Sequence, residues 1–227
     1  MIKLENSSQK KSYSINYFPG EKIWAGTFLR GAGDLEFPSE QVARLNQTHS
    51  DHIAWVSRES FPGREIADTD AVITQDRGVV LTIRTADCAP VFIFDPDAPV
   101  IALIHAGWRG ARLGIVRKTV QALCERTGTA PGRLQAAIGP AIRACCYEFD
   151  TEEIPEFKPH MTRVRGKFHF DLAGYLRDEL AGCGVGQESL FDSGLCTYCN
   201  PDDFFSYRRE KAGCGRMVSY MMMRGEK

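Results

Sequence analysis

The chain has 227 residues, of which 43% are hydrophobic, 25% charged and 10% aromatic, the composition of an ordinary globular protein. Its 28 lysine and arginine residues stand against 29 aspartate and glutamate residues, which leaves a formal net charge of −1. This balance does not favour a polyanionic partner, so we expect no nucleic acid and no membrane surface but a small-molecule partner.

The first half of the sequence is rich in short, strand-like segments. Residues 1–12 resemble a loose end or a short edge element, and residues 13–18 and 23–28 alternate weakly, as an early pair of strands would. Ser39 is placed to cap a short helix that continues to Asn46. Runs of Val, Ile, Thr and Phe bounded by Gly, Pro or Asp then predict strands over 53–56, 71–74, 79–83, 91–94 and 100–104.

The second half contains the clearest helix. Over residues 111–126 the apolar side chains recur at helical spacing with charges between them, and Gly128 and Pro131 end the pattern. Residues 134–138 predict a further buried strand, Asp171 is placed to cap a second helix, and residues 216–223 predict a last strand. No repeat or linker divides the sequence. We therefore predict an α+β (mixed α/β) fold in which residues 1–227 form a single domain with a central mixed sheet flanked by helices.

The cellular location that we expect follows from two features that the sequence lacks. No stretch reaches the roughly 18 consecutive apolar residues of a membrane span, and the polar first residues lack the apolar core of a secretory signal. We expect a cytoplasmic protein that is a monomer or a weak homodimer. In a reducing compartment its eight cysteines are thiols, metal ligands or nucleophiles before they are disulfides.

Three metal-binding side chains lie near the ends of predicted elements: His49, Cys88 and His105. Two imidazoles and one thiolate suit a borderline-soft ion such as zinc, and three protein ligands leave a fourth position open for chemistry. Their spacing matches no zinc-finger pattern, so alternatives stay open at this point. Cys88 can be a small core residue or a nucleophile activated by a histidine, and His49 can merely complete a turn.

Longer motifs around these residues are specific. The chain carries RTADCAP at 84–90, HAGWRG at 105–110, IGP at 138–140, CCYE at 145–148, CTYC at 196–199 and FSYRR at 205–209. From about Gln47 to the C-terminus it resembles the laccase-domain family, also called the multicopper polyphenol oxidase-like or peptidoglycan editing factor family. The members are understood as zinc-dependent purine nucleoside phosphorylases with adenosine deaminase activity.

The resemblance implies a ligand set, a fold and substrates. The family's metal ligands carry over onto His49, Cys88 and His105, in a mixed α/β domain related to cysteine-hydrolase-like toxins. Zinc is the expected metal, with copper possible in the same site. The substrates implied are a small nucleoside (adenosine, inosine or methylthioadenosine) and phosphate. The oxidase name fits poorly, because five histidines are too few for a multicopper cluster bound mainly by imidazole.

Phosphorolysis needs an anion pocket, and arginines within the motifs suit phosphate oxygens: Arg84, Arg109, Arg208 and Arg209. Trp108 and Tyr207 are candidates to stack on a purine. The chain lacks the His-x-Glu motif of zinc nucleobase deaminases, so another carboxylate must carry protons in a deamination. The candidates are Asp87, Asp70 and Glu148, although Asp87 can instead hold the ligand loop.

Other functions stay open at this stage. The same site can serve an amidase that edits peptidoglycan precursors, a weak copper-dependent polyphenol oxidase, or a binding module without catalysis. Cys196 and Cys199 form half of a zinc knuckle, and the other pair would have to be Cys145 with Cys146 or Cys183 with Cys214. A buried structural turn is the interpretation that we favour for this motif.

Overall fold

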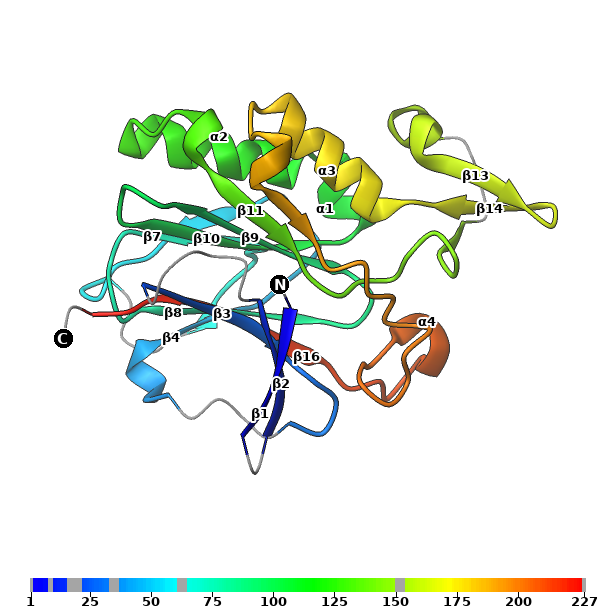
Figure 1. The fold of residues 1–227 in the computed structure, drawn as a ribbon, viewed down its shortest axis with the longest axis horizontal. Helices are drawn as coiled ribbons and strands as arrows, with labels where there is room; N and C mark the ends of the chain where they lie inside the picture. The colour runs from blue at the N-terminus through cyan, green and yellow to red at the C-terminus, as the bar shows by residue number, and fades with distance from the viewer. Residues whose placement is uncertain are drawn as a thin grey trace.

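Two large β-sheets packed face to face and one layer of helices form the main body of the protein (Figure 1). The computed structural model describes residues 2–7, 10–15, 22–32, 37–60, 65–149 and 154–225. The mixed α/β fold expected from the sequence is confirmed, although the expected central sheet is divided into two sheets and the helices cover one face only.

The middle layer is a six-stranded mixed sheet that carries most of the site. Its strands, in spatial order, are β15 (Leu190–Asp192), β11 (Gln135–Ile138), β9 (Ala89–Asp95), β10 (Val100–Ala106), β7 (Ala71–Thr74) and β5 (Ile53–Trp55). The outer pairs β15–β11 and β7–β5 are parallel, while the central pairs are antiparallel. Five of these strands match the segments predicted over 53–56, 71–74, 91–94, 100–104 and 134–138, whereas β15 was not predicted.

The second layer is a seven-stranded sheet. Its order is β1 (Ile2–Ser7), β2 (Lys10–Ile15), β3 (Ile23–Phe28), β16 (Met217–Met223), β8 (Val80–Thr85), β4 (Val42–Leu45) and β6 (Glu65–Ile66). Within residues 1–12, which were expected to be a loose end or an edge element, Ile2–Ser7 forms the edge strand of this sheet.

Both faces of the middle sheet are buried, which explains its continuous apolar strands. In β10, Ala102 and Ile104 pack toward the helices, whereas Ile101 and Leu103 pack toward the seven-stranded sheet. The alternation follows from the two-residue period of a strand. Because the sheet is covered on both sides, its polar groups are confined to the strand ends, where the candidate ligands lie.

The helices are α1 (Trp108–Arg112), α2 (Ile115–Thr127), α3 (Leu172–Gly182) and the short α4 (Tyr207–Glu210). The first three lie on the outer face of the six-stranded sheet (Figure 1). The Asp171 cap is confirmed, since its carboxylate accepts a hydrogen bond from the Gly174 amide. Among the described residues no helix has the length and apolarity needed to cross a membrane.

Two helix predictions were wrong in detail. The continuous helix expected over 111–126 is broken at Gly114, whose φ of 75° is left-handed, and Leu113 beside it is 47% exposed. The helix expected from Ser39 to Asn46 is a single 3₁₀ turn, η1 (Ser39–Gln41), followed by strand β4. The β-branched and apolar residues of β4 pair with β8 and are mostly buried, so tertiary packing overrides the local capping signal.

The remaining elements were not predicted from the sequence. A three-stranded antiparallel sheet contains β12 (Glu148–Phe149), β14 (Lys167–Phe170) and β13 (Met161–Val164). Further 3₁₀ turns are η2 (Pro131–Arg133), η3 (Pro155–His160) and η4 (Gln187–Ser189).

Candidate functional site

The three predicted ligands come together where strands of both sheets end. His49 lies in the turn after β4, Cys88 lies between β8 and β9, and His105 is the penultimate residue of β10. Strands β9 and β10 are antiparallel and pair Ala89 with Ala106, which brings Cys88 next to His105. The ligand atoms of the three side chains all lie within 4.8 Å of one another, and Cys88 Sγ is 3.8 Å from His49 Nε2.

Asp70, the residue just before β7, orients two of the three ligands. Its side chain is fully buried, and its Oδ1 lies 2.7 Å from Nδ1 of His105 and accepts a hydrogen bond from the His49 amide. Its Oδ2 accepts bonds from the Thr48 and Ser50 amides and from the Ser50 hydroxyl. A carboxylate on Nδ1 leaves Nε2 of His105 available to a metal, as in many metal centres.

Gly107 permits the close approach of the ligands. A Cβ at this position would lie 2.8 Å from Cys88 Sγ and 3.2 Å from His49 Cδ2. Two residues near Gly107 adopt left-handed backbone conformations, His49 with φ 62° and Asp87 with φ 88°. Such conformations in non-glycine residues are held by surrounding structure and gather at functional sites.

The electrostatics of the three side chains favour a thiolate. Burial raises the pKa of Cys88, but the positive charge and hydrogen bonding of His105, helped by His49, outweigh it and lower that pKa to about 6. Burial lowers the pKa of His105, whereas the Cys88 thiolate and Asp70 raise it to about 9. Thiolate character is what a metal ligand requires.

The donor set fits a zinc ion. Two imidazole nitrogens and one sulfur are ligands of the kind that zinc takes, and their mutual distances allow one ion to contact all three. Cys88 is only partly buried, and all three side chains line one cavity of about 870 Å³. A bound ion would therefore keep a position open toward that cavity.

The cavity is positively charged and partly aromatic. The basic residues that line it are Arg84, Arg109, Arg208, Lys211 and Arg216, against the acidic Glu65 and Asp87. Trp108, Tyr147 and Tyr207 supply aromatic surface. A volume of this size holds a ligand as large as a nucleoside, and the excess of cations favours an anion beside it.

Several sequence-predicted substrate residues reach this cavity, namely Arg84, Arg109, Arg208, Tyr207 and Trp108. The Arg208 guanidinium donates to the Glu148 carbonyl and lies over the Tyr147 ring, and Arg109 lies over Trp108. Arg209 has a different place. Its guanidinium donates to the carbonyls of Thr197, Tyr198 and Phe204, so its contacts are those of a structural residue.

The three predicted proton carriers are placed differently from one another. Asp70 is buried behind His105 and does not line the cavity, and Glu148 is also absent from the lining and pairs with Lys167 at 2.7 Å. Asp87 lines the cavity, but Thr197 donates to one of its oxygens and the Arg208 amide to the other. Positioning is the role that the contacts of Asp70 and Asp87 support.

Some lining residues were not selected from the sequence. Tyr147 follows the Cys145–Cys146 pair, and Lys211 and Arg216 flank the last loop before β16. The CCYE motif containing Tyr147 was recognised only as part of the resemblance. Lys211 and Arg216 lie in no distinctive motif, so only the fold brings them to the cavity.

Comparison with known proteins identifies the family of the chain. Residues 27–224 match the family described as multi-copper polyphenol oxidoreductase laccase. The chain belongs to this family. The resemblance that the sequence motifs indicated is therefore confirmed over residues 27–224 of this laccase-family protein.

Relatives of this laccase-family protein bear the names of nucleoside enzymes. A purine nucleoside phosphorylase of Deinococcus radiodurans is 37% identical over 193 residues, which cover 83% of this chain and 72% of the relative. An adenosine deaminase named RL5, from an unknown prokaryotic organism, is 34% identical over 193 residues, 78% of this chain and 73% of that protein. The crystal structure of YlmD from Geobacillus stearothermophilus superposes with a TM-score of 0.90 at 25% identity, covering 99% of this chain and 100% of that one.

Proposed function

We propose that this protein is a zinc-dependent purine nucleoside phosphorylase that also deaminates adenosine. The observation that carries the proposal is the convergence of His49, Cys88 and His105 on the wall of a cationic cavity with room for a nucleoside. The names of the Deinococcus relative and of the RL5 deaminase support the two activities. The substrates proposed are adenosine, inosine and methylthioadenosine, with phosphate as the acceptor of the sugar.

The metal would be held by Nε2 of the two histidines and by the Cys88 sulfur. Zinc in this position supplies a Lewis acid with a free coordination position facing the cavity. Asp70 keeps His105 in the tautomer that leaves Nε2 free, and Gly107 leaves room for the sulfur. These two residues prepare the ligands and need not contact substrate.

Phosphate is proposed to bind among the arginines of the cavity. Arg109 and Arg208 line it from α1 and α4, and neither forms an ion pair among the described residues. Guanidinium groups bind phosphate oxygens through two parallel hydrogen bonds and keep their charge at every physiological pH. Arg84 is less available, because Glu65 lies 3.9 Å from it.

The departing base needs a hydrogen-bond donor. In phosphorolysis the bond between the base nitrogen and C1′ of the sugar breaks as a phosphate oxygen bonds to C1′, and negative charge develops on the purine. Tyr147 lines the cavity, and burial raises the pKa of its phenol, so the hydroxyl stays protonated. No described residue hydrogen-bonds that hydroxyl, which leaves it free to donate to the purine.

The test combines metal analysis with a phosphate-dependent adenosine assay on the purified protein. The variants His49→Ala, Cys88→Ala and His105→Ala should each lose about one equivalent of zinc, because each removes one of three ligands, and should lose base release. Cys183→Ser is the matched control, since Cys183 lies at the end of α3 and not at the cavity.

Two results would replace the proposal. Base release that does not need phosphate would indicate hydrolysis rather than phosphorolysis. Phosphate-independent cleavage of a serine-containing peptidoglycan precursor, lost in Cys88→Ala, would indicate the amidase instead.

A further inference from the structure

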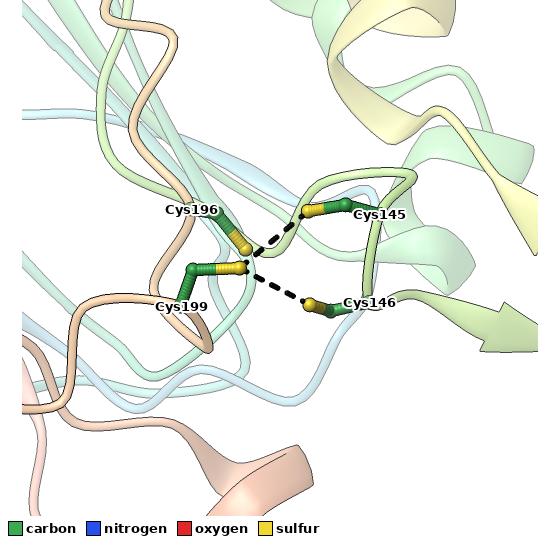
Figure 2. Close-up of side chains that lie close together, drawn as sticks. All are labelled: Cys145, Cys146, Cys196 and Cys199. Atoms are coloured by element: carbon green, nitrogen blue, oxygen red, sulfur yellow. Dashed lines mark hydrogen bonds between the residues drawn. The ribbon is translucent and has the colours of Figure 1, made fainter.

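A second cluster of metal-binding side chains lies outside the histidine-containing site. The sulfurs of Cys145, Cys146, Cys196 and Cys199 all lie within 4.8 Å of one another (Figure 2). They come from two segments far apart in the sequence, one between β11 and β12 and one between β15 and α4. The sequence identified Cys145 with Cys146 as one of two possible partners for the Cys196–Cys199 pair, and the structure brings these four together.

Two measured separations between the sulfurs are close to those of a tetrahedral zinc site. Cys199 Sγ lies 3.7 Å from the sulfur of Cys145 and 3.3 Å from that of Cys146. Four sulfurs at 2.3 Å from a central zinc ion lie about 3.8 Å apart, so these separations are close to those of a zinc–thiolate centre. A disulfide would require about 2.05 Å between two sulfurs, and all eight cysteines are free thiols in the structure.

The surroundings of Cys196 favour a thiolate, because hydrogen bonds to its sulfur lower its pKa against the effect of burial. Without an ion, burial raises the pKa of Cys145 and Cys146. The backbone amides of Arg143 and Cys199 donate hydrogen bonds to the Cys196 sulfur, and such bonds favour the charged form of a sulfur. Four thiolates on one divalent ion leave a net charge of −2. The Arg209 guanidinium donates to the carbonyls of Thr197 and Tyr198, within the Cys196–Cys199 turn, and supplies positive charge beside it.

The two segments run side by side before they reach the cysteines. The amide of Ala141 donates to the Leu195 carbonyl, and the amide of Thr197 donates to the Ala141 carbonyl. Arg143 on one segment forms a part-buried ion pair with Asp192 at 2.6 Å, at the start of the other. The backbone therefore fixes the two halves of the cluster against each other, and the sulfurs face inward from both (Figure 2).

We propose that Cys145, Cys146, Cys196 and Cys199 bind a structural zinc ion, distinct from the ion proposed at His49, Cys88 and His105. A site with four protein ligands has no open position, so its ion holds structure and does not react. The ion joins the segment that carries Tyr147 to the segment whose Thr197 hydroxyl donates to Asp87, next to Cys88. Its loss should loosen one wall of the cavity and lower the thermal stability of the whole chain.

Zinc content of the full-length protein, purified under reducing conditions, tests the proposal. The wild type should hold about two equivalents per chain, one for each site. Cys88→Ala should lose one, Cys146→Ser with Cys199→Ser should lose the other, and the combined variant should lose both. Cys183→Ser and Cys214→Ser remove thiols outside both clusters and should keep both equivalents.

The two sites fail separately in this design. A single equivalent that disappears in Cys88→Ala overturns the structural ion and leaves the proposed function intact. A single equivalent that survives in Cys88→Ala but disappears in the variant with both Cys146→Ser and Cys199→Ser overturns the metal of the proposed function and supports the structural ion.

A spectroscopic measurement covers the case in which the double variant does not fold. X-ray absorption at the zinc edge of the Cys88→Ala variant should give a shell of sulfur alone at about 2.3 Å. Nitrogen in that shell, or a disulfide between Cys146 and Cys199 found by mass spectrometry of the alkylated protein, overturns the proposal.

Discussion

Replacing Gly107 by alanine should weaken zinc binding at the histidine-containing site without unfolding the protein. The residue has φ −86° and ψ 174°, a conformation that alanine adopts freely, so the effect comes from the added methyl group alone. That carbon would lie 2.8 Å from Cys88 Sγ and 3.2 Å from His49 Cδ2, whereas carbon contacts are ordinarily about 3.5–4.0 Å. The sulfur must therefore retreat by roughly 0.7 Å or more to reach that contact distance.

A displacement of that size is large for a metal ligand. Metal–ligand distances in working sites stay within about 0.2 Å of their preferred values. Losing a group that only orients a ligand costs about 10–100-fold in metal affinity, and moving the sulfur itself should cost at least as much. We therefore expect about 100-fold weaker zinc binding, or roughly 2.7 kcal/mol.

The assay is competition for zinc with a chromophoric chelator, following the ion that Cys88→Ala lacks, with thermal unfolding recorded beside it. Gly182→Ala is the control, because a Cβ there meets no atom within 4 Å and lies in helix α3. It should keep the zinc affinity and gain up to about 1 kcal/mol of stability. Wild-type zinc affinity in Gly107→Ala would show that His49 and Cys88 do not share an ion next to this glycine.

Three further predictions use other parts of the chain. Asp70→Asn removes the charge that orients His105 and should lower zinc affinity by about 10–100-fold in the same competition; an unchanged affinity would make this carboxylate dispensable. Arg208→Gln should raise the KM for phosphate by about tenfold or more in steady-state kinetics and change the KM for adenosine less, and equal changes would argue against an anion site. Burial raises the pKa of Glu179 from 4.5 to about 7. Between these two pH values the folded protein keeps a proton that the unfolded chain has lost. The free energy of unfolding therefore falls as pH rises through about 7. Glu179→Gln should therefore stabilise the protein at pH 8 by roughly 1 kcal/mol and have little effect at pH 4, as measured by urea unfolding; an equal effect at both pH values would contradict this.

The sequence predicted the middle of the fold better than its edges. Strands of the six-stranded sheet are apolar on both faces, so their pattern is strong and local. The helix that follows was also recognised, but its break was not, because Gly114 in a left-handed conformation looks like any other glycine in the sequence. Strand β4 was mistaken for a helix, since its strand character comes from pairing with β8, which lies far along the chain.

The candidate site, like the fold, was predicted only in part from the sequence. The residue types of His49, Cys88 and His105 are distinctive, and so is their place beside strand ends. Roles that depend on the three-dimensional geometry could not be predicted as well from the sequence. Asp70 was selected for its carboxylate, yet only its burial and its bond to His105 indicate a positioning role. Glu148 was selected from its motif, but the side chain pairs with Lys167 instead of reaching the cavity.

The name of the family raises the question of whether the protein can hold a copper cluster, and the histidines answer it. All five histidines lie in the described residues, and only His49 and His105 share a site. His52 lies next to Asp68, His160 pairs with Asp178, and His169 hydrogen-bonds the Ala144 carbonyl. A cluster of coppers bound mainly by imidazole would need more of them in one place. The described residues offer two sets of metal ligands. The first set has two nitrogens and one sulfur and leaves a coordination position open. The second set has four sulfurs and leaves none. Both suit single zinc ions, and only the first can take part in a reaction.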